Sequence, residues 1–179
     1  MLKLNKTNSV LLNAEYLPSN NCDNRPTDVE IDTIILHCIS LPEGNYSTDY
    51  VIDFFLNKLN LNAHSSFQKL KDIKVSSHIF IRRNGDIIQF VPFDLRAWHA
   101  GKSSFKGREN FNDFSIGIEL EGTTTSVFEE IQYDILKNVI KTLKSSYTSI
   151  EDNNILGHSD ISPDRKSDPG PFFNWNKIK

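Results

Sequence analysis

Two histidines and an aspartate, far apart in the chain, have the side chains that a catalytic zinc site uses. His158 opens a short loop, Asp168 lies in that loop between Ser167 and Pro169, and His37 ends an apolar run far upstream. Two histidines and one carboxylate hold zinc in several hydrolases and leave the fourth position for water. Three prolines stiffen the loop, which lowers the entropy cost of holding ligands in place. The combination predicts a metal-dependent hydrolase.

Each of these residues also has an ordinary structural interpretation, and other ligands and metals compete. His37 alone could be a core histidine, and an aspartate before proline is often a turn former. Asp160 and Asp164 are rival carboxylates that we expect to act as caps or as partners of a histidine. A facial iron site also uses two histidines and a carboxylate, but that site needs a further histidine, and none follows His158.

A zinc hydrolase needs a carboxylate near the metal to move a proton, and Glu119 is our candidate. The segment 115–121 alternates apolar and other residues, so Gly117, Glu119 and Glu121 share one strand face. We expect Gly117 to leave open space on that face, and Glu121 stays an alternative to Glu119. Lys166 could stabilise a developing oxyanion, although most lysines are simply exposed.

Three further histidines have less specific surroundings. His64 lies in a polar loop, so we expect it to be exposed. His78 precedes a strand, so we expect structural hydrogen bonds. Trp98 and His99 occur together in a loop, where aromatic side chains more often form the wall of a pocket than carry out chemistry.

Length and composition favour one globular domain. The chain has 179 residues, 38% of them hydrophobic and 24% charged, and a net charge of −3. The absence of a basic excess argues against nucleic-acid binding, and two cysteines do not make a disulfide framework. The sequence has no apolar stretch typical of a signal peptide or a membrane span, so we expect a cytoplasmic protein without a membrane partner.

The order of elements predicts an α/β fold. We expect residues 1–30 to form an irregular arm packed on a single domain over residues 31–179. The apolar run 33–39 predicts a strand buried on both faces, and Asn84-Gly85 predicts a hairpin. Strands interleaved with helices imply a mixed central β-sheet flanked by helices.

Two helices should cover the sheet. Ser47 or Thr48 could cap a helix that begins near residue 49. Ser126 and Glu129 match a capping box ahead of a second helix that ends near residue 145. That helix carries one apolar stripe, formed by Phe128, Ile131, Ile135, Val139, Ile140 and Leu143.

Four segments together resemble the AmpD-type N-acetylmuramyl-L-alanine amidases of the amidase-2 superfamily, which includes peptidoglycan recognition proteins. They occur in the order typical of that family from about residue 31 onward. The segments read ILHCISLPEG (35–44), VSSHIFIRRNGDIIQFVPFDLRAWHAG (75–101), NDFSIGIELEGT (112–123) and GHSDISPDRKSDPGP (157–171).

The resemblance implies roles for individual residues of an amidase domain over residues 31–179. It implies zinc ligands at His37, His158 and Asp168, in a surface groove at the edge of the sheet. It makes Glu119 the catalytic carboxylate and Lys166 the positive partner of the oxyanion. It also implies that the substrate is bound by Trp98, His99, Ala100 and Lys74.

The same resemblance implies an activity, a substrate and a location. The expected reaction is zinc-dependent hydrolysis of the amide bond between the lactyl group of 1,6-anhydro-N-acetylmuramyl-peptides and L-alanine, in cytoplasmic peptidoglycan recycling. The partner would be a small muropeptide, and no nucleic acid is expected. Lys74 and Asn110 stand where arginine is usual in the family, and Cys38 stands where asparagine is common, which bears on substrate binding rather than on the zinc ligands.

Two other functions fit parts of the pattern. Some members of the superfamily bind peptidoglycan fragments without cutting them, but this chain retains Glu119 and Lys166 besides the ligands. A lytic amidase that acts on the intact cell wall is the other alternative, and it would be supported by export or wall-binding segments.

Overall fold

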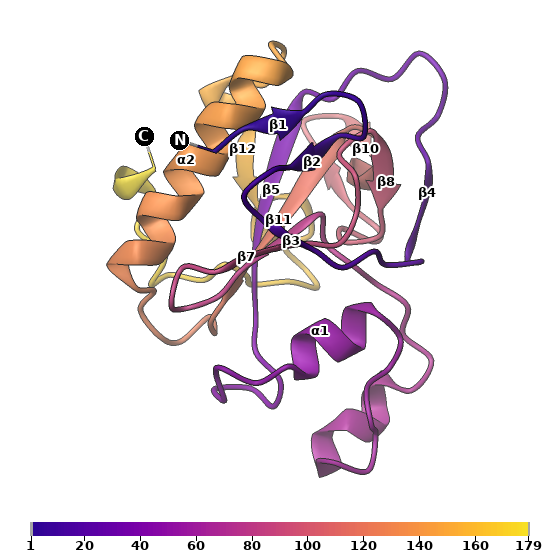
Figure 1. The fold of residues 1–179 in the computed structure, drawn as a ribbon, viewed down its shortest axis with the longest axis vertical. Coiled ribbons are helices and arrows are strands. Elements are labelled where there is room, and N and C mark those ends of the chain that lie inside the picture. Colours follow the sequence, from indigo (N-terminus) through magenta and orange to yellow (C-terminus); the bar gives the residue numbers. More distant parts are fainter. Residues whose placement is uncertain (1, 179) are drawn as a thin grey trace.

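The computed structural model describes residues 2–178, and its centre is a mixed six-stranded sheet (Figure 1). In the sheet, β12, β5, β11 and β6 run parallel, β7 is antiparallel to β6, and β3 is parallel to β7. The strand order across the sheet is β12 (Ile155–Gly157), β5 (Thr33–Ile39), β11 (Ser115–Glu121), β6 (Ile79–Ile81), β7 (Ile87–Gln89) and β3 (Glu15–Tyr16). The α/β class with a mixed sheet is confirmed.

The two central strands, β5 and β11, pair over seven residues each. Most of their side chains are buried. β5 supplies apolar residues to both faces of the sheet, whereas β11 supplies Ile116, Ile118 and Leu120 to one face and Gly117 and Glu119 to the other. The pairing runs from Ser115 opposite Thr33 to Glu121 opposite Ile39. This register places Glu119 directly opposite His37, and paired residues of neighbouring strands have side chains on the same face.

The predicted hairpin is confirmed between β6 and β7, with Ile81 opposite Ile87 at its end. Gly85 has φ of +91°, a conformation that glycine adopts without steric cost. The Asn84 side chain accepts a hydrogen bond from the Asp86 N–H at 3.1 Å. The tight turn brings β7 back beside β6.

Helix α2 (Glu130–Ser146) covers one face of the sheet (Figure 1). It buries Leu136, Val139 and Leu143 against apolar side chains of β5, β6 and β11. The predicted capping box, with Ser126 as the N-cap, was wrong. Glu129 is the N-cap, and the side chain of the buried Gln132 accepts from the Glu129 N–H at 3.0 Å. The predicted stripe was wrong at two positions, since Ile131 is 43% exposed and the buried Phe128 precedes the helix.

Helix α1 (Tyr50–Phe55) and the 3-10 helix η1 (Ser65–Leu70) form a separate lobe away from α2 (Figure 1). Phe54 and Phe55 pack with Phe80 of β6 in a second apolar cluster. The predicted cap was wrong, because Asp49 is the N-cap and the Thr48 hydroxyl instead donates to the Leu41 carbonyl at 3.1 Å. Helices therefore flank the sheet, as expected.

The remaining elements are short. Among residues 2–178, three antiparallel pairs lie outside the main sheet and join β1 to β2, β4 to β8 and β9 to β10. The strands are β1 (Leu4–Asn5), β2 (Val10–Leu11), β4 (Cys22–Asn24), β8 (Leu95–Ala97), β9 (Ser104–Phe105) and β10 (Arg108–Glu109). The helices are α3 (His158–Ile161) and the 3-10 turns η2 (Phe111–Asp113), η3 (Asp152–Asn154) and η4 (Trp175–Lys177).

The N-terminal segment is more regular than the sequence suggested. It forms the β1–β2 pair, contributes β3 to the edge of the main sheet, and pairs β4 with β8. The division of the chain at residue 30 stays a prediction, but the segment before it packs on the domain through backbone pairing.

Arg25 ties this segment to the turn before β11. Its guanidinium donates to the carbonyls of Phe93 (3.1 Å), Asn112 (3.1 Å), Asp113 (2.9 Å) and Ser115 (2.9 Å). Burial lowers the pKa of Arg25 to about 10, so the side chain is still charged at neutral pH. One charged side chain thus satisfies acceptors from two loops.

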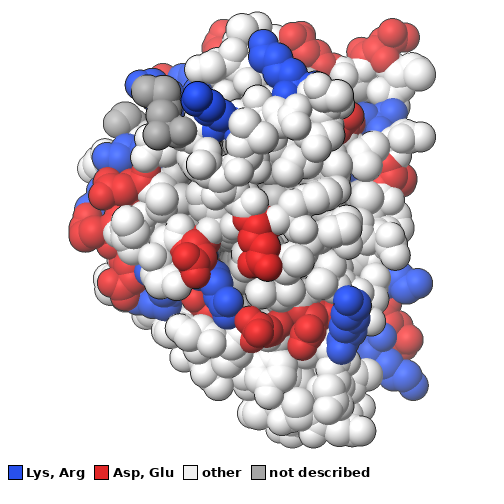
Figure 2. Space-filling model, viewed as in Figure 1, with Lys and Arg blue, Asp and Glu red and all other residues white. Residues whose placement is uncertain are grey.

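Acidic and basic side chains are interspersed on the face shown in Figure 2, rather than gathered into one basic area. Among the helices of residues 2–178, none combines the length and apolar character needed to cross a membrane.

We predict that Arg25→Ala lowers the free energy of unfolding by on the order of 3 kcal/mol, because buried carbonyls lose a charged donor. The measurement is urea unfolding followed by circular dichroism. Arg108→Ala is the control: its side chain is 45% exposed and paired with Asp32, so we expect a loss below about 1 kcal/mol. Equal losses in the two variants would contradict the anchoring role of Arg25.

Candidate metal centre

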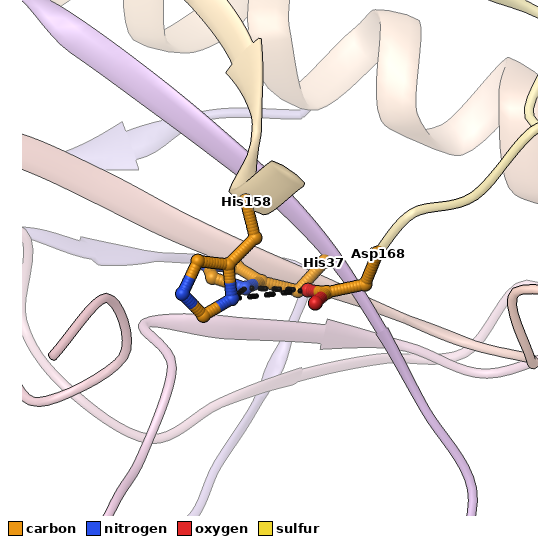
Figure 3. A group of neighbouring side chains, drawn as sticks. All are labelled: His37, His158 and Asp168. Atoms are coloured by element: carbon orange, nitrogen blue, oxygen red, sulfur yellow. Dashed lines mark hydrogen bonds and ion pairs between the residues drawn. The ribbon is translucent and has the colours of Figure 1, made fainter. Parts of the chain in front are cut away.

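Three segments of the fold bring His37, His158 and Asp168 together (Figure 3). His37 lies on β5, and His158 is the first residue of α3, directly after β12. Gly157 pairs with Leu36 in the parallel β12–β5 ladder. His158 and His37 are the next residue of each segment, which brings the two histidines close together. Asp168 comes from the loop after α3, whose Ser159 N–H is bonded to the Asp168 carbonyl at 2.9 Å.

The three ligand atoms form a compact triangle. His37 Nδ1 lies 2.9 Å from His158 Nδ1 and 3.0 Å from Asp168 Oδ2, and His158 Nδ1 lies 3.2 Å from Asp168 Oδ2. Tetrahedral zinc with bonds of about 2.0 Å separates its ligand atoms by about 3.3 Å. The arrangement is therefore close to what a single small cation requires.

The protonation of the donors also fits a cation. His158 Nε2 lies 3.0 Å from the Ala100 carbonyl, which can only accept, so the ring proton is on Nε2 and Nδ1 has a lone pair. Burial lowers the pKa of His37 to about 4, so that this ring is neutral at pH 7. Two neutral imidazoles and a carboxylate are the donor set that zinc binds in hydrolases. The three residues thus fit a bound zinc ion.

Glu119 faces the same region from β11. Its Oε2 is buried and, among the atoms of residues 2–178, has no hydrogen-bond partner. Burial raises the pKa of Glu119 well above its ordinary value, Asp168 raises it further, and Lys166 opposes both. A buried carboxylate oxygen without a partner is rare, so this side chain is available to a ligand or to water.

Glu121, which the sequence left as an alternative, has a different environment. It is buried, and its carboxylate accepts from the Ser47 N–H at 2.7 Å and from the Arg83 N–H at 3.0 Å. Both oxygens are therefore engaged in holding two loops.

A cavity of about 260 Å³ lies over the three ligands. Glu119 and Lys166 line it together with the ligands and with apolar side chains. The apolar side chains are Phe54, Phe55, Leu70 and Ile73 of the α1 lobe and Ile39 and Leu41 at and after the end of β5. A groove of about 600 Å³ continues from it and shares Cys38, Leu41 and Lys166. The expected surface groove is present at the ligands.

The four predicted substrate-binding residues differ in their positions. His99 lines the cavity, and Lys74 lines an adjoining hollow of about 330 Å³ that shares Phe54 and Leu70 with it. Ala100 is fully buried, so its carbonyl rather than its side chain faces the ligands. Trp98 is half-buried beside β4, and its contact with substrate stays a prediction.

Sequence reasoning missed where His99 points. The open space expected beside Gly117 is filled by this ring: a Cβ atom at Gly117 would lie 2.4 Å from His99 Cγ. The ring instead contacts His37, with His37 Nε2 and His99 Nδ1 3.0 Å apart. A glycine inside a strand often marks the close approach of another group, and this was the signal available in the sequence.

The other histidines and carboxylates that the sequence offered lie outside the group of ligands. His64 is exposed, and His78 is buried and accepts from the Gly117 N–H at 3.0 Å, as predicted. Asp160 accepts from the Gly157 N–H at 2.7 Å, which is the predicted capping role. Asp164 is exposed.

Comparisons with known proteins match most of this chain. The family model described as N-acetylmuramoyl-L-alanine amidase matches residues 27–171. The 1,6-anhydro-N-acetylmuramyl-L-alanine amidase AmpD of Salmonella typhimurium (strain SL1344) is 46% identical over 94% of this chain and 90% of that protein. The AmpD of Escherichia coli (strain K12) is 45% identical over 94% and 92%.

Solved structures agree. A crystal structure of a selenomethionine derivative of AmpD superposes with a TM-score of 0.94 at 44% identity, covering 98% of this chain and 96% of that one. The amidase AmiD from Escherichia coli, in complex with anhydro-N-acetylmuramic acid-L-Ala-D-γ-Glu-L-Lys, superposes with a TM-score of 0.60 at 32% identity, covering 87% of this chain and 59% of that one.

We predict that zinc raises the melting temperature of the metal-free protein by several degrees, because a ligand that binds only the folded chain stabilises it. Asp168→Asn should remove most of this shift. Asp164→Asn, in the same loop but exposed, should retain it. Differential scanning fluorimetry with and without zinc measures the shift, and an undiminished shift in Asp168→Asn would exclude Asp168 as a ligand.

Proposed function

The chain belongs to the N-acetylmuramoyl-L-alanine amidase family, and from that membership we propose the reaction and the residues that carry it out. The protein hydrolyses the amide bond between the muramyl lactyl group and L-alanine of 1,6-anhydro muropeptides. The observation that carries this proposal is the metal-ligand triangle beside a buried carboxylate without a partner, in a chain that is 46% identical to an anhydromuramyl-L-alanine amidase over most of both lengths.

Substrate complexes of related enzymes support the class of substrate. AmiD was solved with an anhydromuramyl tripeptide. AmpDh3 of Pseudomonas aeruginosa was solved with an anhydromuramic pentapeptide. In our proposal the groove beside the ligands receives the equivalent part of a muropeptide, with Lys74 and Trp98 as further contacts.

We assign zinc to His37, His158 and Asp168. When bound there, zinc supplies a Lewis acid next to the scissile carbonyl and makes a neighbouring water more acidic. The protein's part is to hold two neutral imidazoles and one carboxylate at the required separations. Those separations follow from the β12–β5 pairing and from the proline-rich loop.

Glu119 moves the proton. Glu119 lines the cavity next to the ligands and its Oε2 has no partner among residues 2–178, so the carboxylate can take a proton from the attacking water and give it to the nitrogen of the leaving L-alanine. The apolar wall from the α1 lobe keeps this carboxylate in a poorly solvated environment. Its raised pKa suits a group that must hold the proton between the two transfers.

Lys166 stabilises the developing oxyanion. It lines both the cavity and the adjoining groove, so its ammonium group can reach the carbonyl oxygen of a substrate that lies across them. Loss of one such donor typically lowers the rate by about 100- to 1,000-fold.

The location and the domain division are part of the same proposal. The enzyme acts in the cytoplasm on fragments released during peptidoglycan turnover. Residues 31–179 form the amidase domain, and residues 1–30 form an arm anchored by Arg25.

We predict that Glu119→Gln retains zinc but lowers kcat by at least about 100-fold, since proton transfer by a positioned side chain contributes about that much. Zinc content by mass spectrometry and kinetics on an anhydromuramyl peptide measure the two effects. Near-normal turnover by Glu119→Gln would place the base elsewhere.

Glu121→Gln is the matched control. This carboxylate holds the Ser47 and Arg83 N–H groups, so the variant should be less stable while its kcat, measured on folded protein, stays close to that of the wild type. A loss of kcat as large as that of Glu119→Gln would contradict the division of roles between the two glutamates.

The substrate is tested by a product assay with the zinc-loaded protein on anhydromuropeptide and on intact sacculi. We expect release of L-alanyl peptide from the soluble fragment, read by mass spectrometry. Turnover of sacculi alone would instead identify a lytic amidase, and binding without release would identify a recognition module.

A further inference from the structure

His99 lies between the proposed ligand His37 and the hydroxyl of Ser115. Its Nδ1 is 3.0 Å from His37 Nε2, and its Nε2 is 3.3 Å from Ser115 Oγ. The Ser115 hydroxyl in turn donates to the Phe111 carbonyl. These contacts link the ligand to a backbone carbonyl through the half-buried His99 and the buried Ser115.

The Phe111 carbonyl at the end of this series of hydrogen bonds fixes the direction of each of them. A carbonyl only accepts, so the single Ser115 proton points to Phe111, and Ser115 Oγ is left to accept from His99. His99 therefore has its proton on Nε2 and a lone pair on Nδ1. That lone pair accepts from His37 Nε2, so His37 has its own lone pair on Nδ1, the atom that faces His158 and Asp168.

We propose that His99 is a positioning residue for the metal centre: together with Ser115 it fixes the proton of His37 on Nε2 and so keeps Nδ1 free to bind the metal. This inference rests on the proposed metal centre and deepens it. The substrate-binding role implied by the resemblance stays a prediction beside it, since His99 also lines the cavity.

The alternative proton position shows why this series of hydrogen bonds, called the relay below, matters for metal binding. If His99 were protonated on Nδ1, it would donate to His37 Nε2, and His37 would then have its proton on Nδ1. That proton would lie between His37 and Asp168, where it competes with a cation for the same lone pair. Histidine ligands of metals generally donate their other N–H to an acceptor, and loss of that acceptor typically costs about 10- to 100-fold in metal affinity.

The surroundings of His99 hold the ring in this place. Gly117 leaves the room that the ring fills, because any Cβ there would overlap it. The Asn112 side chain accepts from the backbone N–H groups of His99 at 3.1 Å and of Ala100 at 2.8 Å. Since the Ala100 carbonyl accepts from His158 Nε2, one two-residue segment orients both histidine ligands.

Zinc affinity in matched variants tests the inference. His99→Leu removes the acceptor and Ser115→Ala removes the group that orients it, whereas His99→Asn keeps an acceptor oxygen near the position of Nδ1. Thr33→Val is the control, because Thr33 is a buried hydroxyl directly opposite Ser115 on β5, with its hydrogen bond to Asp32 instead. The dissociation constant is measured for each folded variant by competition with a chromogenic zinc chelator.

We expect His99→Leu and Ser115→Ala to weaken zinc binding by about 10- to 100-fold relative to Thr33→Val, with Ser115→Ala toward the lower figure. His99→Asn should recover part of the loss. Wild-type protein that binds zinc, with His99→Leu and Ser115→Ala equal to Thr33→Val, would overturn this inference and leave the metal centre intact. A wild type that does not bind zinc would overturn the metal centre as well.

The tautomers are also directly measurable in the wild type, without any substitution. Long-range proton–nitrogen correlation spectra of the histidine rings distinguish a protonated Nε2 from a protonated Nδ1. We expect His37 and His99 both to be protonated on Nε2 in the zinc-loaded protein. A proton on Nδ1 of His99 would contradict the relay.

Discussion

Three electron-pair donors point at one buried position, and the rest of the structure can be understood as the means of holding them there. Two neutral imidazoles and a carboxylate at separations of 2.9–3.2 Å repel one another where their lone pairs converge. A bound cation relieves this repulsion, and the folded chain must oppose it until the cation binds. The strength of this constraint explains why the ligands are held by strands, by a stiff loop and by further hydrogen bonds behind each ring.

The parallel part of the sheet supplies the first of these restraints. His37 lies near the carboxyl end of β5, His158 follows β12, and Glu119 lies opposite His37 on β11. Open α/β sheets commonly place their sites at the carboxyl ends of strands. Because each neighbour is set by backbone pairing, a shift of register by one residue would turn Glu119 away from the ligands. The α1 lobe adds apolar side chains to the lining of the cavity beside the ligands, and Glu119 and Lys166 give the same lining charged groups.

Local sequence signals predicted the elements that have strong periodicity or turn chemistry. The strands at 33–39 and 115–121 and the Asn84–Gly85 hairpin all formed at the expected residues. The errors have a common cause in contacts between distant segments. Residues 4–24 form strands of only two or three residues, too short to show a period, and these strands exist because the rest of the sheet offers them partners. The cap of α2 lies at Glu129 because Gln132 is held by the carbonyls of Ile81 and Glu121.

The site shows the same division. Residue types and the motif resemblance predicted the group of three ligands. They did not predict which side chains surround the ligands. Pattern alone could not separate Glu119 from Glu121, since both point the same way on one strand; only the loops that bind Glu121 do so. It also could not show that His99 contacts a ligand, because Gly117 and His99 meet only in the folded sheet.

The most direct test of the central claim is anomalous diffraction at the zinc absorption edge from crystals of the zinc-loaded protein. The account predicts one strong peak about 2.0–2.2 Å from His37 Nδ1, His158 Nδ1 and an oxygen of Asp168. A peak bound through the Nε2 atoms, a peak at another group of residues, or a loaded protein without a peak at these three side chains would contradict it.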